Sequence, residues 1–421
     1  MPTVSDASSR KLPPEIVLLQ NGHADLAIPM LEEKLGKTPN DWKQHVNIGI
    51  GYRLTGQYLL ALLHQKLATQ LRPDNAATWH NLSVTQTEIG SFEEAFLSAQ
   101  QAHSLAPHHP QTLLSYACAL MREGKIHLAW PYWEEARYRS TFAEFPGVRL
   151  WTGEEDLKGK RVLVMREGGF GDSIMFLRWF PDLIERGAVV YFQCWDEQVE
   201  LFSGNPWVPF LIPQSQAIAP RDFDFCVSLL SLPALLNCQP DAIPCAEHYI
   251  EANPKHIAEF SKVLGRKKNH ILGICWGAEE KGSQKLTRTI PDKEIEILKS
   301  CAFDWVSLWP EHDTDWITGR TGTRLGPWHM TAALIANLDA VVTVDTAVAH
   351  MAGAMGKPTF LILPAGSDWR WFRDTRPRIH GETLPIETSV WYPSMKVFRS
   401  QKPGSFADAI EAVVHEINAG S

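Results

Sequence analysis

One candidate for acid–base chemistry is Asp172, which ends a glycine-rich stretch between an apolar run at 161–165 and a helical run at 173–186. A glycine-rich turn between a strand and a helix lets backbone approach a ligand closely, and Gly169 and Gly171 lie in this turn. A carboxylate at that position can take a proton from a hydroxyl nucleophile. It can equally serve as a plain helix N-cap, and the residues alone leave both interpretations open.

A second group of residues could hold phosphate. The stretch 338–363, LDAVVTVDTAVAHMAGAMGKPTFLIL, predicts a buried strand, a short helix and a second buried strand. Asp345 and Thr346 are both suitable N-cap residues, and Gly356 stands where a helix commonly ends. The free N–H groups of such a helix start favour an anion such as phosphate, and His350 lies one turn further along. An ordinary βαβ unit would show the same pattern.

Cationic residues could support the same phosphate. An apolar run at 271–276 predicts a strand that ends at Trp276, and Lys281, Lys285 and Arg288 follow on a polar loop. Cations on a loop after a strand are suited to phosphate, although lysines on exposed loops are usually just solvated. We therefore add Trp276, Lys285 and Arg288 to the residues expected to bind the phosphates of a nucleotide-linked donor.

The elements that position these residues alternate between strand and helix, which predicts doubly wound parallel sheets. We place one Rossmann-like domain at 160–252, which carries Asp172, and a second at 268–421, which carries the residues suited to the phosphates of a nucleotide-linked donor. Two such α/β halves that face each other form a cleft where ligands usually bind.

The N-terminal third is a repeat. Gly22, Gly56, Gly90 and Gly124 are 34 residues apart, and an alanine series and a proline series keep the same step. This period resembles the tetratricopeptide repeat, a helix–turn–helix unit that stacks into an α-solenoid. Residues 1–142 hold three good repeats and a degenerate one, and 143–159 form a connector. Such a solenoid forms a groove for a protein segment, or its helices only brace the next domain.

Composition narrows the class of protein. The chain has 421 residues and a net charge of −8, which argues against a general nucleic-acid or anionic-membrane binder. Seven scattered cysteines without a CxxC pair favour free thiols in a reducing cytosol over disulfides or zinc. The N-terminus lacks a signal peptide, and no run reaches about 18 apolar residues. A cytoplasmic protein without a membrane span is expected.

Together these residues resemble the heptosyltransferase-like (family 9-like) glycosyltransferases, which have the GT-B fold. The opening strand at 161–165, Gly171-Asp172 and Pro181 are similar to the first half of that family, although Pro181 lies a few residues late. The resemblance implies that Asp172 is the catalytic base. Arg288-Thr-Ile-Pro291 and Asp345-Thr346 followed by His350 are similar to the donor-phosphate motifs of the second half.

Two late segments, Trp369-Arg-Trp371 and 391–399, resemble a bacterial subgroup that carries tetratricopeptide repeats ahead of the transferase. Members of this kind include flagellin glycosyltransferases. The order of repeats and GT-B module is also similar to protein O-GlcNAc transferase, whose signature residues are not clearly present.

The predicted function is an inverting, metal-independent transfer of a sugar from a nucleotide-sugar donor to a hydroxyl of a protein acceptor such as flagellin, with no cofactor. A lipid-linked or polysaccharide acceptor, or a non-catalytic repeat scaffold, remain the alternatives. Two DxD triplets, at 222–224 and 313–315, could suggest a metal-dependent transferase, but such short acidic matches are common by chance.

Overall fold

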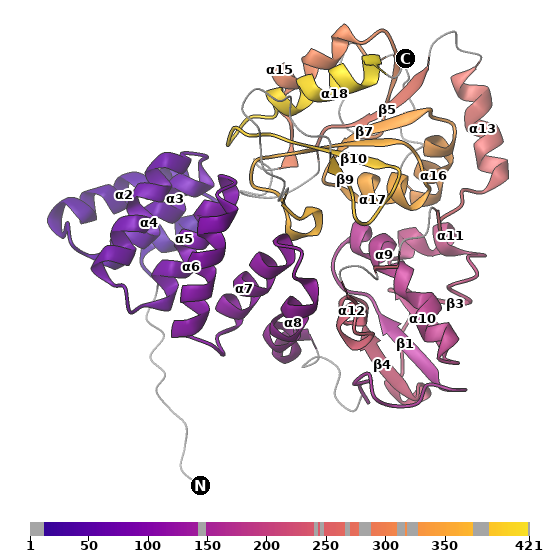
Figure 1. Ribbon diagram of the computed structural model, residues 1–421, viewed down its shortest axis with the longest axis horizontal. Helices are drawn as coiled ribbons and strands as arrows, with labels where there is room; N and C mark the ends of the chain where they lie inside the picture. Colours follow the sequence, from indigo (N-terminus) through magenta and orange to yellow (C-terminus); the bar gives the residue numbers. More distant parts are fainter. Residues whose placement is uncertain are drawn as a thin grey trace.

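The computed structural model describes residues 12–141, 149–239, 243–244, 248–265, 270–277, 288–309, 316–317, 327–373 and 387–419. They form a helical N-terminal region and two α/β domains, which lie on the same side of the helical region (Figure 1). This is the predicted order of an α-solenoid followed by a GT-B module of two Rossmann-like domains.

The solenoid consists of helix pairs that follow the 34-residue period. Each pair joins consecutive helices, α1 with α2 through α7 with α8. The first helix of each pair ends near a glycine with φ between 72° and 80°, at Gly22, Gly56, Gly90 and Gly124. Glycine takes this left-handed conformation without steric cost, which explains the residue type at that step. The helices are α1 (Pro14–Gln20), α2 (Ala24–Lys37), α3 (Trp42–Leu54), α4 (Tyr58–Leu71), α5 (Ala76–Glu88), α6 (Phe92–Leu105), α7 (Pro110–Arg122) and α8 (Ile126–Thr141).

The first α/β domain is built on a four-stranded parallel sheet with the order β3-β2-β1-β4. Its strands are β1 (Arg161–Met165), β2 (Val189–Cys194), β3 (Phe210–Pro213) and β4 (Phe225–Ser228). Its helices are α9 (Phe170–Phe176), η1 (Leu177–Trp179), α10 (Phe180–Glu185), η2 (Asp196–Gln198), α11 (Val199–Phe202), η3 (Pro220–Asp222), η4 (Leu229–Ser231) and α12 (Leu232–Leu235). The helix predicted at 173–186 therefore begins earlier, at Phe170, and is broken by a 3₁₀ turn.

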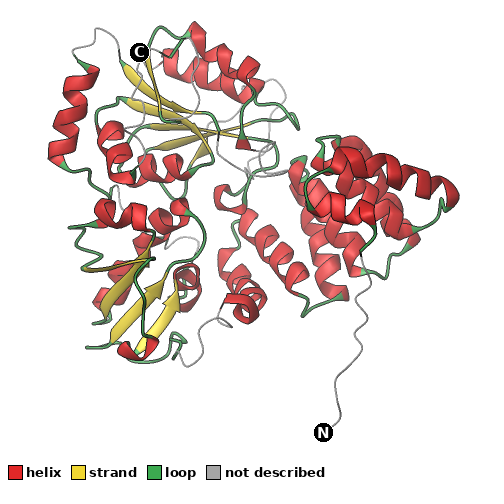
Figure 2. Ribbon diagram, turned by 180° about the vertical axis from the view of Figure 1, so that it is seen from behind, coloured by secondary structure: helices red, strands yellow, loops and turns green. Residues whose placement is uncertain are grey.

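The second α/β domain has a six-stranded sheet with the order β6-β5-β7-β8-β10-β9, in which only β9 is antiparallel. Its strands are β5 (Ile271–Cys275), β6 (Asp304–Ser307), β7 (Ala340–Val344), β8 (Thr359–Leu363), β9 (Glu387–Thr388) and β10 (Met395–Arg399). Its helices are α13 (Pro254–Leu264), α15 (Asp292–Ile295), η5 (Glu296–Ser300), α16 (Trp328–Ala336), α17 (Ala347–Ala354), η7 (Trp369–Trp371) and α18 (Ala407–Ala419). Figure 2 shows helices flanking both sheets, as a doubly wound fold requires.

The predicted strand–helix–strand unit at 338–363 is present as β7, α17 and β8. All five residues of β7 are buried, which explains their continuous apolar run. Gly356 has φ of 67° just beyond the end of α17, as predicted for a residue that ends a helix.

The last helix of the solenoid contacts both α/β domains. Trp130 and Trp133 of α8 meet Trp369 of the second domain edge-on, with ring centroids 6.2 and 5.5 Å away. Arg137 of α8 donates through Nε to Oε1 of Glu167 at 3.0 Å, and Glu167 belongs to the glycine-rich turn of the first domain. The repeats therefore support segments from both halves, in agreement with the bracing role left open by the sequence.

The six cysteines among the described residues carry free thiols, as predicted, and Cys245 lies outside those residues. Within the described ranges, no helix combines the length and the apolar character that crossing a membrane requires.

Candidate active site

Asp172 lies in the first turn of α9 and holds the glycine-rich turn closed. Its Oδ2 accepts a hydrogen bond of 2.8 Å from the backbone N–H of Gly169, the N-cap residue. Its Oδ1 accepts from Nη2 of Arg370 at 2.5 Å. The Asp172 side chain is only 15% exposed. Because a carboxylate offers about four lone-pair sites, these two bonds leave acceptor capacity for a substrate hydroxyl.

Arg370 joins the two α/β domains at this point. It comes from η7, and its Nη1 also donates to Oδ1 of Asp368 at 2.8 Å. Burial opposes its charged form, but the carboxylates of Asp172 and Asp368 outweigh burial and raise the pKa of Arg370. The guanidinium lies 4.5 Å from the ring centroid of Trp369, and its backbone carbonyl accepts from Nε1 of Trp391. One fixed cation therefore connects the acidic residue of α9 to the tryptophan-rich segment.

The start of α17 is arranged differently. Thr346 is its N-cap, and no side chain caps the helix. Asp345, the other candidate for the N-cap, has its carboxylate buried, with Oδ2 3.5 Å from Nη2 of Arg288. Burial raises the pKa of Asp345, although Arg288 acts in the opposite direction. Of the two candidates, Thr346 is therefore the N-cap and Asp345 is not, since its carboxylate pairs with a cation rather than with the helix backbone.

His350 faces α9 rather than open solvent. Its Nδ1 is 2.9 Å from the hydroxyl of Tyr392, and its ring stacks on Trp371 at a centroid distance of 5.3 Å. Burial, with Arg370 nearby, lowers the pKa of His350 to about 3, so the ring is neutral at physiological pH. A Cβ on Gly171 would lie 2.6 Å from His350 Cδ2, so only glycine allows α9 and α17 to approach this closely.

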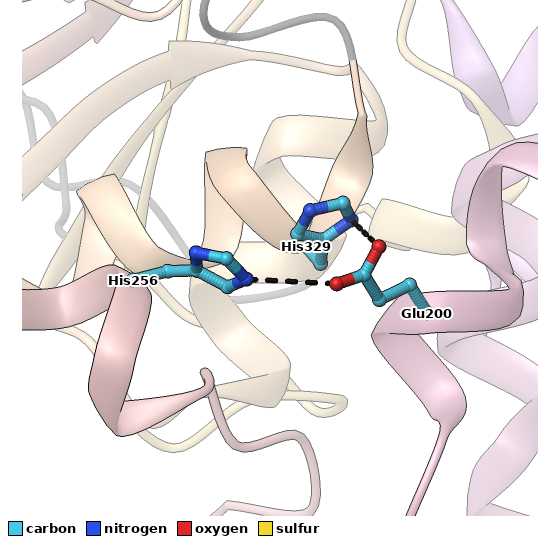
Figure 3. Close-up of side chains that lie close together, drawn as sticks. All are labelled: Glu200, His256 and His329. Atoms are coloured by element: carbon cyan, nitrogen blue, oxygen red, sulfur yellow. Dashed lines mark ion pairs between the residues drawn. The ribbon is translucent and has the colours of Figure 1, made fainter. Parts of the chain in front are cut away.

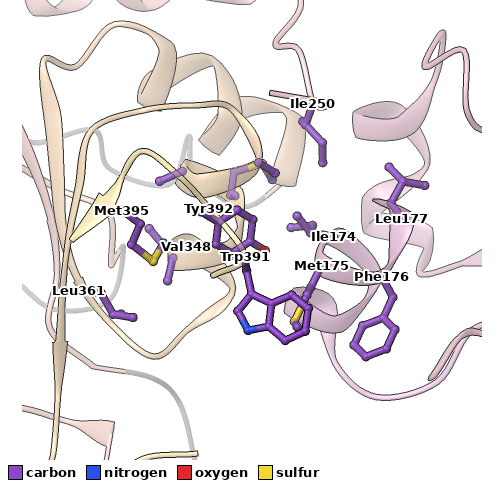
Figure 4. Packing of buried hydrophobic residues seen from close by; sticks show 14 of the residues in the cluster. Ile174, Met175, Phe176, Leu177, Ile250, Val348, Leu361, Trp391, Tyr392 and Met395 are labelled. Carbon is purple, nitrogen blue, oxygen red and sulfur yellow. The ribbon is translucent and has the colours of Figure 1, made fainter. Parts of the chain in front are cut away.

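Apolar and cationic contacts surround this meeting of the two helices. Figure 4 shows residues of α9 and η1 on one side and Val348, Trp391 and Tyr392 on the other. Arg178 of η1 is 1% exposed and donates through Nη1 to the carbonyl of Trp391 at 2.8 Å. The domain interface around the candidate site is therefore buried and hydrogen-bonded.

The remaining predicted residues are placed less directly. Trp276 is 2% exposed, and its ring packs against Trp309 at 5.2 Å, so its indole is part of the core in this structure. Lys281 and Lys285 lie outside the described residues, as does the DxD triplet at 313–315. In the other triplet, Asp224 accepts from the backbone N–H of Arg161 at 2.7 Å, at the start of β1 and away from the carboxyl ends of the strands.

Sequence reasoning missed Arg370 and Asp368 as site residues, although the Trp-Arg-Trp segment itself was noted. The available signal was their position after β8, where the carboxyl end of a parallel strand faces the cleft. A cation set between two tryptophans at that edge is a candidate partner for any acidic residue across the cleft.

No family model matches the chain. Protein FlbA of Caulobacter vibrioides is 22% identical over 428 residues, which cover 90% of this chain and 67% of FlbA. BBSome complex member BBS4 of Xenopus tropicalis is 31% identical over 124 residues, 28% of this chain and 24% of BBS4.

Two solved structures are also similar to parts of the chain. The E. coli ADP-heptose lps heptosyltransferase II is 14% identical, covers 62% of this chain and 98% of its own, and has a TM-score of 0.44. MamA from Desulfovibrio magneticus RS-1 is 19% identical, covers 30% of this chain and 73% of its own, and has a TM-score of 0.28. The fold assignment stands on the strand order and helix pairs of this chain.

Proposed function

We propose that the protein is an inverting glycosyltransferase that moves a sugar from a nucleotide-sugar donor to a hydroxyl group of a protein acceptor. The observation that carries the proposal is the meeting of α9 and α17 between the two α/β domains. It brings an acceptor-side carboxylate on Asp172 close to a helix that starts without a side-chain cap.

In this proposal Asp172 is the base. Its carboxylate takes the proton of an acceptor Ser or Thr hydroxyl while the oxygen attacks the anomeric carbon of the donor sugar. The bond from that carbon to the donor phosphate breaks, and the nucleoside diphosphate leaves with the bonding electrons. Attack opposite the leaving group inverts the anomeric centre. Arg370 acts as a positioning residue because it fixes Oδ1 of Asp172.

The second domain supplies the charge complement for the leaving group. Thr346 is half-buried at the start of α17, so the N–H groups beside it remain within reach of a phosphate. Arg288 is 32% exposed and stands beside Asp345, just ahead of that helix start. Developing charge on a diphosphate is stabilised strongly by such fixed donors. This electrostatic set does not require a metal ion for the transfer step.

A protein acceptor is proposed because the solenoid offers a groove next to the module. A cavity of about 280 Å³ lies between α5, α6 and α7, lined by Glu88, Leu114 and Arg122 among others. The helices that form it end against the segment that carries Arg370. Nε of Arg122 donates to the carbonyl of Ser367 at 3.3 Å, and Gly366 packs on the backbone of Glu88. A peptide in this cavity would lie beside the segment that positions Asp172.

The proposal is tested with matched leucine variants of the full chain. Leu114 is 39% exposed and lines the groove, whereas Leu59 on α4 is 82% exposed and lines none of the described cavities. Cells that lack the protein should lose specific glycopeptides in mass spectrometry. Leu59→Glu should restore them, and Leu114→Glu should restore about a tenth or less, since one lost anchor of 1.4 kcal/mol weakens binding tenfold.

Other outcomes separate the alternatives. Glycopeptides restored equally by both variants would contradict acceptor binding in the groove. A loss confined to lipid-linked sugars or polysaccharide would identify the alternative acceptor class. In a thermal-shift panel of UDP, GDP, ADP and CMP sugars, one nucleotide should raise the unfolding temperature by mass action. A protein that binds none of them and hydrolyses none would be a scaffold.

A further inference from the structure

Three metal-ligating side chains meet on the side of the domain interface where α11, α13 and α16 come together. Glu200 comes from α11 of the first α/β domain, His256 from α13 and His329 from α16 (Figure 3). One ligand atom of each lies within 4.8 Å of the others. The side-chain amide of Asn337, which follows α16, donates to the carbonyl of Ile257 in α13 at 2.9 Å. This bond ties together the two helices that carry the histidines.

The distance of each histidine nitrogen from the Glu200 carboxylate is that expected between two ligands of one small cation. Oε2 of Glu200 is 3.3 Å from Nδ1 of His329, and Oε1 is 3.5 Å from Nε2 of His256. Ligand atoms around a tetrahedral zinc ion with bonds of about 2.0–2.1 Å lie roughly 3.3–3.5 Å apart. Nδ1 of His329 is buried and makes no hydrogen bond of good geometry among the described residues, although Oε2 of Glu200 lies 3.3 Å away.

A further carboxylate orients one of the rings. Nδ1 of His256 lies 3.3 Å from Oε2 of Glu259, one turn along α13. A carboxylate on one imidazole nitrogen fixes the tautomer that leaves the other nitrogen free to bind a metal ion. This arrangement directs the lone pair of His256 Nε2 toward Glu200. An ion pair of Glu200 with two histidines would need no second carboxylate, so the position of Glu259 favours a metal site.

The cluster also borders a cavity. A space of about 580 Å³ is lined by Glu200, His329, Trp207 and Tyr249 among others. Three protein ligands beside such a space leave a fourth position for water or a small ligand, in contrast to closed four-ligand structural sites. The neighbouring Trp328 packs on Phe170 of α9 at a centroid distance of 5.3 Å, so the cluster adjoins the glycine-rich turn.

We propose that Glu200, His256 and His329 bind one divalent cation of the zinc class and that this ion ties the first α/β domain to the second. Two imidazoles and one carboxylate are the donor set that zinc takes in sites with an open position. The ion has no part in the sugar transfer proposed above, and the inference holds whether or not that function is correct.

The test uses the untagged full chain, stripped with a chelator and titrated with Zn²⁺ against a chromophoric competitor. We expect one tight equivalent per chain. Glu200→Gln, His256→Ala and His329→Ala should each weaken Zn²⁺ binding by about tenfold or more. The control is His108→Ala, since His108 is an exposed histidine paired with Glu135 in the repeats. No tight equivalent in the wild type, or wild-type affinity in the three ligand variants, would overturn the proposal.

A second measurement does not depend on folded variants. Co²⁺ added to the stripped wild-type protein should give the intense visible bands of a four-coordinate nitrogen–oxygen site. Crystals soaked in Zn²⁺ should show an anomalous peak between the three side chains. A cysteine-type charge-transfer band, or a peak elsewhere alone, would place the metal outside this cluster and contradict the assignment.

Discussion

The two helices that meet at the candidate site start in different ways, although each follows a buried parallel strand. α9 carries a carboxylate in its first turn, and Asp172 accepts the N–H of Gly169. α17 starts at Thr346 without any side-chain cap. A carboxylate near a helix start accepts hydrogen bonds from the free N–H groups and offsets the positive end of the helix dipole. A start without such a side chain leaves those N–H groups and the positive end available to an incoming anion.

This difference indicates which kind of ligand the start of each helix can bind. The start of α9 is already supplied with negative charge, and in the proposed reaction it receives a neutral hydroxyl that must lose a proton. Asp345, which directly precedes the N-cap of α17, pairs with Arg288 and does not cap the helix. One polypeptide thus presents two related strand–helix turns with opposite electrostatic roles. Breaking each role separately gives distinct expected results.

The largest effect is expected from Asp172→Asn, which keeps the shape and one acceptor oxygen for Gly169 but removes the base and the charge that Arg370 contacts. Transfer turnover should fall by about 10²–10⁴-fold, the usual contribution of a general base, while donor affinity stays within about twofold. Turnover is measured with saturating donor and acceptor. Asp222→Asn, on an exposed aspartate of the DxD triplet, is the control. Near-normal turnover in Asp172→Asn would show that Asp172 is not the catalytic base.

Arg370→Ala should produce the largest loss of stability. It removes the cation that two carboxylates share and leaves Asp172 and Asp368 without their partner in a mostly buried place. The free energy of unfolding should fall by about 3–5 kcal/mol, as for other buried pairs that lose one member. Denaturant unfolding measures it, with Arg161→Ala as the exposed control. A loss below about 1 kcal/mol would show that the pair is effectively solvated.

Arg288→Ala examines the α17 side of the comparison. The donor should bind about 10–100-fold more weakly, because a charge-assisted contact to phosphate contributes about 1.5–3 kcal/mol. Isothermal titration with the nucleotide sugar found in the panel gives the affinity. Arg161→Ala is the control and should leave the donor affinity unchanged, because Arg161 lies at the amino end of β1 in the first domain. Equal affinity in both variants would contradict the assignment of Arg288 to the donor phosphates.

The smallest effect concerns His350 and pH. Its pKa is lowered to about 3 in the folded protein, so the unfolded chain binds a proton first as pH falls below about 6.5. Stability contributed by the neutral ring is therefore present above that pH and is lost toward acid, by about 1.4 kcal/mol per pH unit.

His350→Gln should flatten the dependence of unfolding free energy on pH by up to that slope between about pH 6.5 and 4.5. Other histidines with lowered pKa values, such as His64, His80 and His103, contribute equally to wild type and variant, so the difference isolates His350. Parallel curves would mean that His350 has the same pKa in the folded and the unfolded protein, which contradicts the lowered pKa.

Local and periodic features could be predicted from the sequence, and contacts made by docking could not. The 34-residue period predicted the helix pairs correctly, because the conformation of each glycine turn depends on residues close by in the sequence. The β7–α17–β8 unit followed from its apolar runs and its closing glycine. The partner of Asp172 is 198 positions away in sequence, and no local pattern specifies that distance.

The contacts of individual side chains could also not be predicted from a local sequence pattern. Asp345 was suited to capping, but the position of Arg288 drew its carboxylate away. His350 was suited to facing a ligand, but the close approach of Gly171 and the ring of Trp371 enclosed it. In each case the deciding neighbour comes from another segment of the chain, so the outcome depends on tertiary packing, within the second domain for Asp345 and partly between the domains for His350.

The contacts of α8 have a practical consequence for producing parts of this protein. Trp130 and Trp133 cover Trp369, and Arg137 holds Glu167, so this helix belongs by its contacts to the α/β module. A fragment that begins after α8 would open a tryptophan-lined surface to water and release the glycine-rich turn. A shortened chain, or a chimera with foreign repeats, should therefore keep α7 and α8 and be joined in the turn before Pro110.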